Sequence, residues 1–227
     1  MISNPAVKRP YRSDVREERA RARRLAVISA ASRLFAEHGY AATSVDAIAK
    51  AADVARATVF NAVGGKPALI RAAYRVAVLG DDEPIAATER PWAKQVYEAR
   101  TQSDVLDAYA RVLLDVFRRV ARVYDALRVA AGVEPELIDF MREVEESRLS
   151  GARAIVDELL LRGGLRPDVS PEMAADILCI FNDPALYSRM VLHRDWDEPA
   201  FNAWLAFAMR TQVLPQPGYR SPSSPST

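Results

Sequence analysis

The sequence predicts an all-α protein built from a small N-terminal three-helix unit and a larger C-terminal helical bundle. No segment alternates between apolar and polar residues for long enough to form a strand. Apolar residues recur every three or four positions over 103–132 and again over 135–162, which is the spacing of one buried helix face. The shorter run 42–66 carries the capping and turn signals of two short helices.

The N-terminal segment is strongly basic. Residues 1–24 hold eight Lys or Arg against three Asp or Glu, although the whole chain has a net charge of only +1. We expect residues 1–24 to form a flexible basic arm, although 12–24 can equally begin an exposed helix. Either form can contact phosphates or a minor groove, or it can be a solvated tail.

A first helix follows from Leu25, with apolar residues at helical spacing up to Phe35, and Gly39 is its expected end. Within the next run, Thr43 and Asp46 have the Thr-x-x-Asp spacing of a capping box and predict a helix start. Asp53 tolerates a left-handed backbone, which favours a turn there.

A second short helix is expected over 56–63, with Val59 facing inward and three polar side chains facing elsewhere: Arg56, Thr58 and Asn61. Two helices crossing at a tight turn, the second with exposed donors and acceptors, form a helix-turn-helix that can enter a DNA major groove. The positive charge of the neighbouring N-terminal segment favours the same partner.

At these residues the chain resembles the DNA-binding domain of the tetracycline-repressor (TetR) family of bacterial transcription regulators. The resemblance covers residues 25–74, in this order and spacing: Leu34-Phe35-Ala36-Glu37-His38-Gly39-Tyr40, Thr43-Ser44-Val45, Ile48-Ala49, Thr58-Val59-Phe60, Gly65-Lys66 and Ala68-Leu69. It implies an N-terminal helix-turn-helix three-helix DNA-binding domain and a C-terminal helical ligand-binding and dimerisation bundle.

The chain departs from the family pattern in three ways. Ala55 stands where a serine usually caps the second short helix, a loss typically of about 1 kcal/mol. Asp53 replaces the usual glycine, and Ala62-Val63 replaces an aromatic pair that helps to hold the phosphate backbone. We therefore assign no polar DNA contact to Ala62.

Arg56 and Asn61 are expected to read base edges, since Arg pairs with guanine and Asn with adenine. Thr43, Ser44, Thr58 and Lys66 are expected to hold phosphates, which fix position more than sequence. The predicted DNA-binding set is Thr43, Ser44, Arg56, Thr58, Phe60, Asn61 and Lys66. The predicted partner is a double-stranded operator.

Residues 75–214 form the predicted second domain, and the tail 215–227, rich in Pro and Ser, is expected to be disordered. Its last two long helices are expected over 170–192, interrupted or kinked at Pro184, and over 199–213. The resemblance implies that these two helices pair with their mates in a homodimer, with Phe181, Leu186, Met190 and Trp204 as candidates for the interface or, equally, for the core.

The resemblance also implies a cavity for an unidentified small-molecule effector. Candidate lining residues are the aromatic and Met side chains at helical spacing, which are otherwise core: Tyr109, Phe117, Tyr124, Phe140, Met141 and Phe181. Arg128 and Glu145 are possible polar anchors.

Other classes of protein find little support. The lone Cys179 cannot form an internal disulfide, and no leader or membrane-length apolar run is present, so a cytoplasmic protein without a membrane partner is expected. Two His and one Cys leave little material for a metal or catalytic site, so no metal, cofactor or enzyme activity is expected. The alternative is a helical dimer that has lost DNA binding and acts as an interaction protein.

Overall fold

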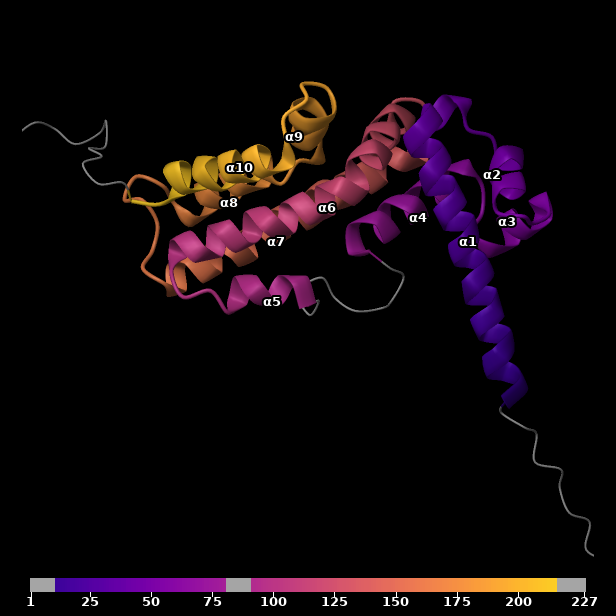
Figure 1. Ribbon diagram of the computed structural model, residues 1–227, viewed down its shortest axis with the longest axis horizontal. Helices are drawn as coiled ribbons and strands as arrows, with labels where there is room; N and C mark the ends of the chain where they lie inside the picture. The colour runs from indigo at the N-terminus through magenta and orange to yellow at the C-terminus, as the bar shows by residue number, and fades with distance from the viewer. Residues whose placement is uncertain (1–10, 81–90, 216–227) are drawn as a thin grey trace, which may run out of the picture.

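The computed structural model describes residues 11–80 and 91–215, and every regular element in these ranges is a helix (Figure 1). The N-terminal domain contains α1 (Tyr11–Ala42), α2 (Val45–Ala51), α3 (Arg56–Ala62) and the start of α4 (Lys66–Leu79). The second domain contains α5 (Pro91–Tyr97), α6 (Gln102–Ala131), α7 (Pro135–Leu161), α8 (Pro171–Phe181), α9 (Pro184–Tyr187), a π-helical turn η2 (Ser188–Leu192) and α10 (Glu198–Val213).

The two domains lie at opposite ends of an elongated molecule. Figure 1 shows α2 and α3 beyond α1 at one end, and α8 and α10 stacked at the other, with α6 and α7 running between them. Both α1 and α4 pack on α6, so the helix-turn-helix is anchored to the second domain through these two helices.

α1 is longer than the sequence analysis predicted. It begins at Tyr11, so residues 12–24 take the second of the two forms left open for them, an exposed helix, and the flexible arm is wrong there. Residues 1–10 lie outside the described part. Acidic residues among the arginines explain the helix: Glu17 precedes Arg21 by four positions, a spacing at which opposite charges stabilise a helix. The regular part of α1 ends at Gly39, as predicted, where φ is 77°.

The C-terminal ends of α4 and α5 are contacted by arginine side chains from other parts of the second domain. The Arg119 guanidinium of α6 donates to the carbonyl oxygens of Ala77 (2.9 Å) and Val78 (3.1 Å), the last turn of α4. Arg162, directly after α7, donates in the same way to the carbonyl oxygens of Tyr97, the last residue of α5, and of Ala99, at 2.8 Å each. These cations satisfy carbonyl groups that a helix end leaves without partners.

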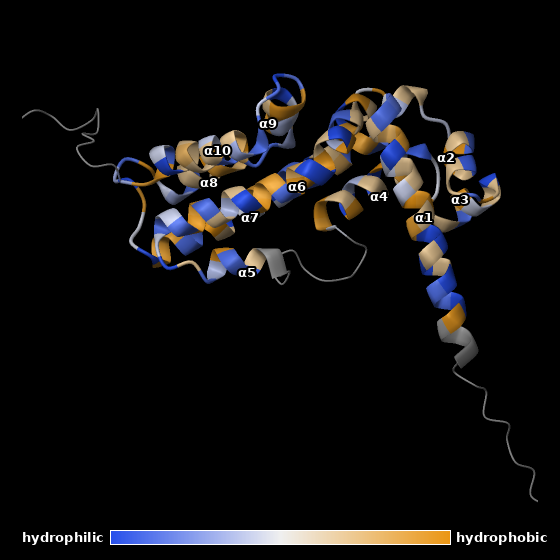
Figure 2. Ribbon diagram, viewed as in Figure 1, coloured by the Kyte–Doolittle hydropathy of each residue, from blue (hydrophilic) through white to orange (hydrophobic). Residues whose placement is uncertain are grey.

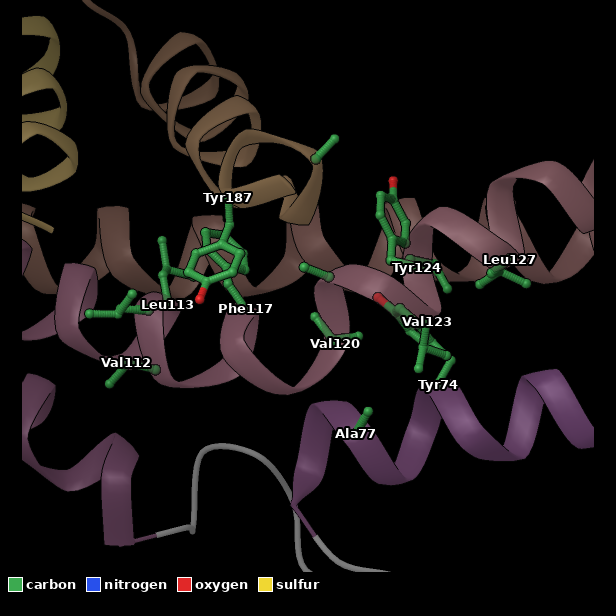
Figure 3. Close-up of a cluster of buried hydrophobic side chains, with 14 of the residues drawn as sticks. Tyr74, Ala77, Val112, Leu113, Phe117, Val120, Val123, Tyr124, Leu127 and Tyr187 are labelled. Carbon is green, nitrogen blue, oxygen red and sulfur yellow. The ribbon is translucent and has the colours of Figure 1, made fainter. Parts of the chain in front are cut away.

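The core is one continuous cluster of apolar side chains that runs through both domains. Hydrophilic and hydrophobic residues alternate along the long helices, as expected for helices with one polar and one apolar face (Figure 2). Figure 3 shows α6 side chains meeting those of α4 and α9 in this core. Phe201 of α10 is fully buried, with its ring centroid 6.4 Å from Phe117 and 5.7 Å from Tyr187.

The predicted break at Pro184 is confirmed, because α8 ends at Phe181 and α9 begins at Pro184. Ser170 caps α8 through a hydrogen bond from the Met173 amide (3.2 Å). The tail beyond Pro215, expected to be disordered, lies outside the described residues.

Two helix caps give a matched test of stability. Ser44 accepts a hydrogen bond from the Ala47 amide at the start of α2, whereas Ala55 makes no such bond at the start of α3. We expect Ser44→Ala to lower the free energy of unfolding by about 1 kcal/mol and Ala55→Ser to raise it by a similar amount. Urea unfolding monitored by circular dichroism measures both. Equal effects of the same sign would contradict this account of the caps.

Candidate nucleic-acid interface and effector cavity

The helix-turn-helix is held by a few buried side chains and one left-handed residue. Ile48 of α2 and Val59 of α3 are fully buried, so each short helix is fixed by an inward anchor. Asp53 has φ 53° and takes the left-handed turn predicted for it. The amide of Val54 donates to Ala49 (3.0 Å), which closes the corner between the two helices.

The opposite side of α3 is exposed and polar. Arg56 pairs with Asp46 of α2, and its guanidinium lies 5.5 Å from the centroid of the Phe60 ring. Phe60 is 44% exposed, Asn61 is exposed, and Thr58 is half-buried. The donors and acceptors expected to meet DNA, Arg56 and Asn61, therefore both lie on the surface of the second helix.

The structure contradicts two predictions made for Thr43, that it caps α2 and that it contacts a phosphate. Its side chain is 2% exposed, and its hydroxyl donates to the carbonyl oxygens of Leu34 (3.1 Å) and Gly39 (2.8 Å). It neither caps α2 nor has a hydroxyl proton available for a phosphate. Ser44 is the cap instead; it is exposed, and while its oxygen accepts from Ala47 its O–H remains able to donate.

Lys66 lies where α4 meets the end of α1. Its ammonium donates to the Ala41 carbonyl (3.3 Å) and lies 4.3 Å from the centroid of the Tyr40 ring. Partial burial lowers the pKa of Lys66, and the nearby Glu134 opposes this shift. The Tyr40 hydroxyl donates to Glu134 (3.1 Å), so this corner joins the first domain to the start of α7.

The N-terminal half of α1 adds a basic surface. Residues 16–24 are all exposed, and they include Arg16, Arg19, Arg21, Arg23 and Arg24. Because these residues are helical, their positive charges lie along a regular helix rather than on a flexible arm.

A cavity of about 520 Å³ opens in the second domain between α4, α5, α6 and α7. Three of the predicted lining residues border it: Tyr109, Phe117 and Phe140. Three others do not. Tyr124 packs against Tyr74 with its hydroxyl beside Arg148, Phe181 packs against Trp204, and Met141 packs against the core.

The sequence analysis missed much of the lining. α4 contributes Tyr74 and Arg75, and α7 contributes Ser147, Arg148 and Gly151. A signal for α7 was present: Ser147, Gly151 and Ala154 are small residues at helical spacing in an otherwise long-chained helix. No sequence pattern in α4 distinguishes cavity-lining residues from core residues, because both lie on the same face of the helix.

Arg128 and Glu145 do not line this cavity. Arg128 is exposed on α6, and Glu145 accepts a hydrogen bond from the Arg148 guanidinium at 2.7 Å. Arg148 does border the cavity, and its side chain is only 10% exposed. Within residues 11–80 and 91–215, no group of three or more His, Cys, Asp or Glu could hold a metal ion. No helix of the same residues is long and apolar enough to span a membrane.

A short helix pair with an exposed polar second helix, mounted on a helical second domain, defines a DNA-binding transcription regulator. Residues 27–73 match the family model described as bacterial regulatory proteins, tetR family. The match covers the helix-turn-helix and parts of the two helices that flank it, α1 and α4. No curated protein matches the chain.

Solved structures share the whole fold. The fatty acid degradation regulator FadR from Bacillus halodurans is 18% identical with a TM-score of 0.64, covering 90% of this chain and 96% of that one. NalD of Pseudomonas aeruginosa, the secondary repressor of the MexAB-OprM multidrug efflux pump, is 18% identical with a TM-score of 0.59 over 85% and 97%. SmeT in complex with triclosan is 16% identical with a TM-score of 0.64 over 91% and 98%.

Proposed function

We propose that the chain is a ligand-responsive repressor that binds a palindromic operator as a homodimer. The observation that carries the proposal is the course of α4. It begins at Lys66, directly after the helix-turn-helix, and its Tyr74, Arg75, Val78 and Leu79 border the cavity. One rigid helix thus joins the DNA-facing surface to the space that a ligand would occupy.

On the DNA side, α3 would lie in the major groove with Arg56 and Asn61 at base edges. Arg56 has to leave Asp46 to do so, which costs little because both side chains are more than half exposed. Ser44, Thr58 and Lys66, together with the basic face of α1, would contact phosphates. Phe60 would support Arg56 through their ring contact.

A homodimer would form through α8 and α10, which pack on each other. Three large apolar side chains are exposed on these helices: Met173, Ile180 and Phe207. An exposed apolar face of this kind marks an interface, and a two-fold axis makes one face complementary to itself. Two α3 helices about 34–36 Å apart would then enter successive major grooves of a palindrome.

Ligand response would act through the contacts between α4 and α7. Arg71 lies 4.0 Å from Glu136, and Arg75 lies 3.3 Å from Glu143 at the edge of the cavity. A ligand that binds better to one placement of α4 shifts the spacing of the two DNA-facing heads. Repression is the proposed sense because NalD, which shares the fold, is a repressor.

The roles of Arg56 and Lys66 can be separated by substitution. We expect Arg56→Ala to cost about 1–3 kcal/mol on the operator and to relax specificity at one base pair in each half-site. Lys66→Ala should weaken binding to every duplex alike and reduce the salt dependence, because it removes a phosphate contact. Fluorescence anisotropy with an operator duplex and its single-base variants measures both.

Lys94→Ala is the matched control, since Lys94 is exposed on α5 at a distance from α3, and it should leave DNA affinity unchanged. Equal losses for Arg56→Ala and Lys66→Ala on every duplex would contradict the division between base and phosphate contacts. DNA binding that depends on neither salt concentration nor duplex sequence would favour the alternative, a helical interaction protein.

A further inference from the structure

We propose that the cavity takes an uncharged, largely apolar ligand that carries an oxygen acceptor, and that the Tyr109 hydroxyl and the Arg148 Nε–H donate to this acceptor. The inference rests on the proposed function, in which the cavity holds the effector, and it names the chemical class of that effector. Four features of the cavity support it.

The walls are apolar on most sides. α6 contributes a row of aliphatic side chains, and α7 adds further ones on the facing side: Val112, Leu113, Val116, Val120, Val144 and Ile155. Aromatic rings close the remainder, with Phe117 and Phe140 both buried. A cavity of about 520 Å³ with such walls holds a molecule of ordinary effector size and gains affinity from apolar area.

Two residues of the lining each carry a buried donor that has no partner in the protein. The Tyr109 hydroxyl and the Arg148 Nε are both buried without a hydrogen bond, although both residues border the cavity. Burial raises the pKa of Tyr109 and Arg148 lowers it, so the hydroxyl stays protonated and the two groups influence each other. A buried donor left without a partner is costly, and a ligand acceptor would satisfy both groups.

The charge of Arg148 is already balanced. Its guanidinium donates to Glu145 at 2.7 Å and to the Cys179 carbonyl at 3.0 Å, and it lies 3.9 Å from Asp183. With two carboxylates around one guanidinium, an anionic ligand group would meet net negative charge. A cationic group would lie against the guanidinium itself, so an uncharged acceptor fits best.

Space for the ligand depends on small residues of α7. An added Cβ at Gly151 would meet no atom within 4 Å, and Ser147 and Ala154 border the same space. Gly151 is an exposed residue of the lining, and glycine in a helix interior is disfavoured, so a larger residue at 151 would enter open space at the edge of the cavity without opposing the helix.

Four probes of similar length test the ligand class with the full chain: methyl decanoate, undecane, decanoate and decylammonium. Isothermal titration should show the ester binding at least about tenfold more tightly than either ion, because only the ester offers an acceptor without charge. Tighter binding of either ion, or binding of none of the four, would overturn the ligand class.

Variants connect the affinity to the named residues. Tyr109→Phe should weaken the ester about fivefold and leave undecane unchanged, since it removes one hydrogen bond and little volume. Tyr187→Phe, the matched change outside the cavity lining, should alter neither affinity. Gly151→Leu should abolish binding of both uncharged probes while circular dichroism shows an intact fold.

Equal weakening of ester and undecane by Tyr109→Phe would contradict the hydrogen bond, and ester binding that persists in Gly151→Leu would contradict the cavity. Operator binding by the same protein, measured without any probe, decides the proposed function separately. The proposed ligand class can therefore be refuted while operator binding is observed. Equally, loss of operator binding can refute the proposed function while the ligand class holds.

Discussion

Replacing Ile180 and Phe207 together by glutamate is expected to convert the protein to a monomer and to lower its operator affinity by about 10²–10⁴-fold. The two side chains are 64% and 59% exposed on helices α8 and α10, which lie at the end of the molecule far from α3 (Figure 1). A two-fold interface would bring four new carboxylates together, whereas each single DNA-binding head would stay intact. Operator affinity falls because the two DNA-binding domains are no longer linked. The second domain binds its half-site at high effective concentration only when it is tethered to the first.

Sedimentation velocity measures the oligomeric state, and anisotropy with the operator duplex measures affinity. Ile138→Glu is the matched control, because Ile138 is an exposed apolar residue of α7 outside the proposed interface, and it should leave both measurements unchanged. A double variant that remains dimeric would refute the placement of the interface on α8 and α10. A monomer that keeps full operator affinity would refute the need for two heads.

Phe201→Ala is expected to lower the free energy of unfolding by about 3–5 kcal/mol, the cost of removing a large buried ring and leaving a cavity. Phe201 is fully buried on α10 and contacts three rings, with centroids 6.4 Å from Phe117, 5.7 Å from Tyr187 and 5.8 Å from Trp204. These ring contacts add to the loss of buried area. Guanidinium unfolding at one fixed protein concentration measures the effect.

Phe60→Ala is the matched control for this substitution. Phe60 is 44% exposed on α3 and contributes little to the core, so its removal should change the free energy of unfolding by less than about 0.5 kcal/mol. Comparable losses for the two variants would mean that the ring cluster around Phe201 is not a centre of stability.

The sequence was sufficient where a local signal decides the structure. Gly39 ends the regular part of α1, Asp53 takes the left-handed turn, and Pro184 separates α8 from α9. Each is a backbone property of one residue type, which needs no knowledge of distant contacts. The inward side chain of Val59 followed from spacing alone.

Failures occurred where two signals competed or where distant segments converge. Thr43 and Ser44 are both good caps, and only the packing of α1 decides that Thr43 is buried and Ser44 is the cap. The Thr101 capping box with Asp104 starts α6 and was readable in the sequence, yet it was overlooked.

The cavity could not be derived from helical periodicity. Phe140 lines it and the adjacent Met141 does not, because neighbouring residues on a helix point about 100° apart. Its polar group, Arg148, is defined by partners on α6 and α8 and by the Asp183 that follows α8, which are far away in the chain. The link between Tyr40 and Glu134 likewise spans residues that no local pattern relates.

The most direct test of the central claim is an anisotropy titration of the purified protein with the duplex upstream of its own gene and with an unrelated duplex, at about 50 and 200 mM salt. A DNA-binding regulator should bind the upstream duplex tightly and selectively, with affinity that falls steeply as salt rises. Equally weak binding to both duplexes at both salt concentrations would contradict the account.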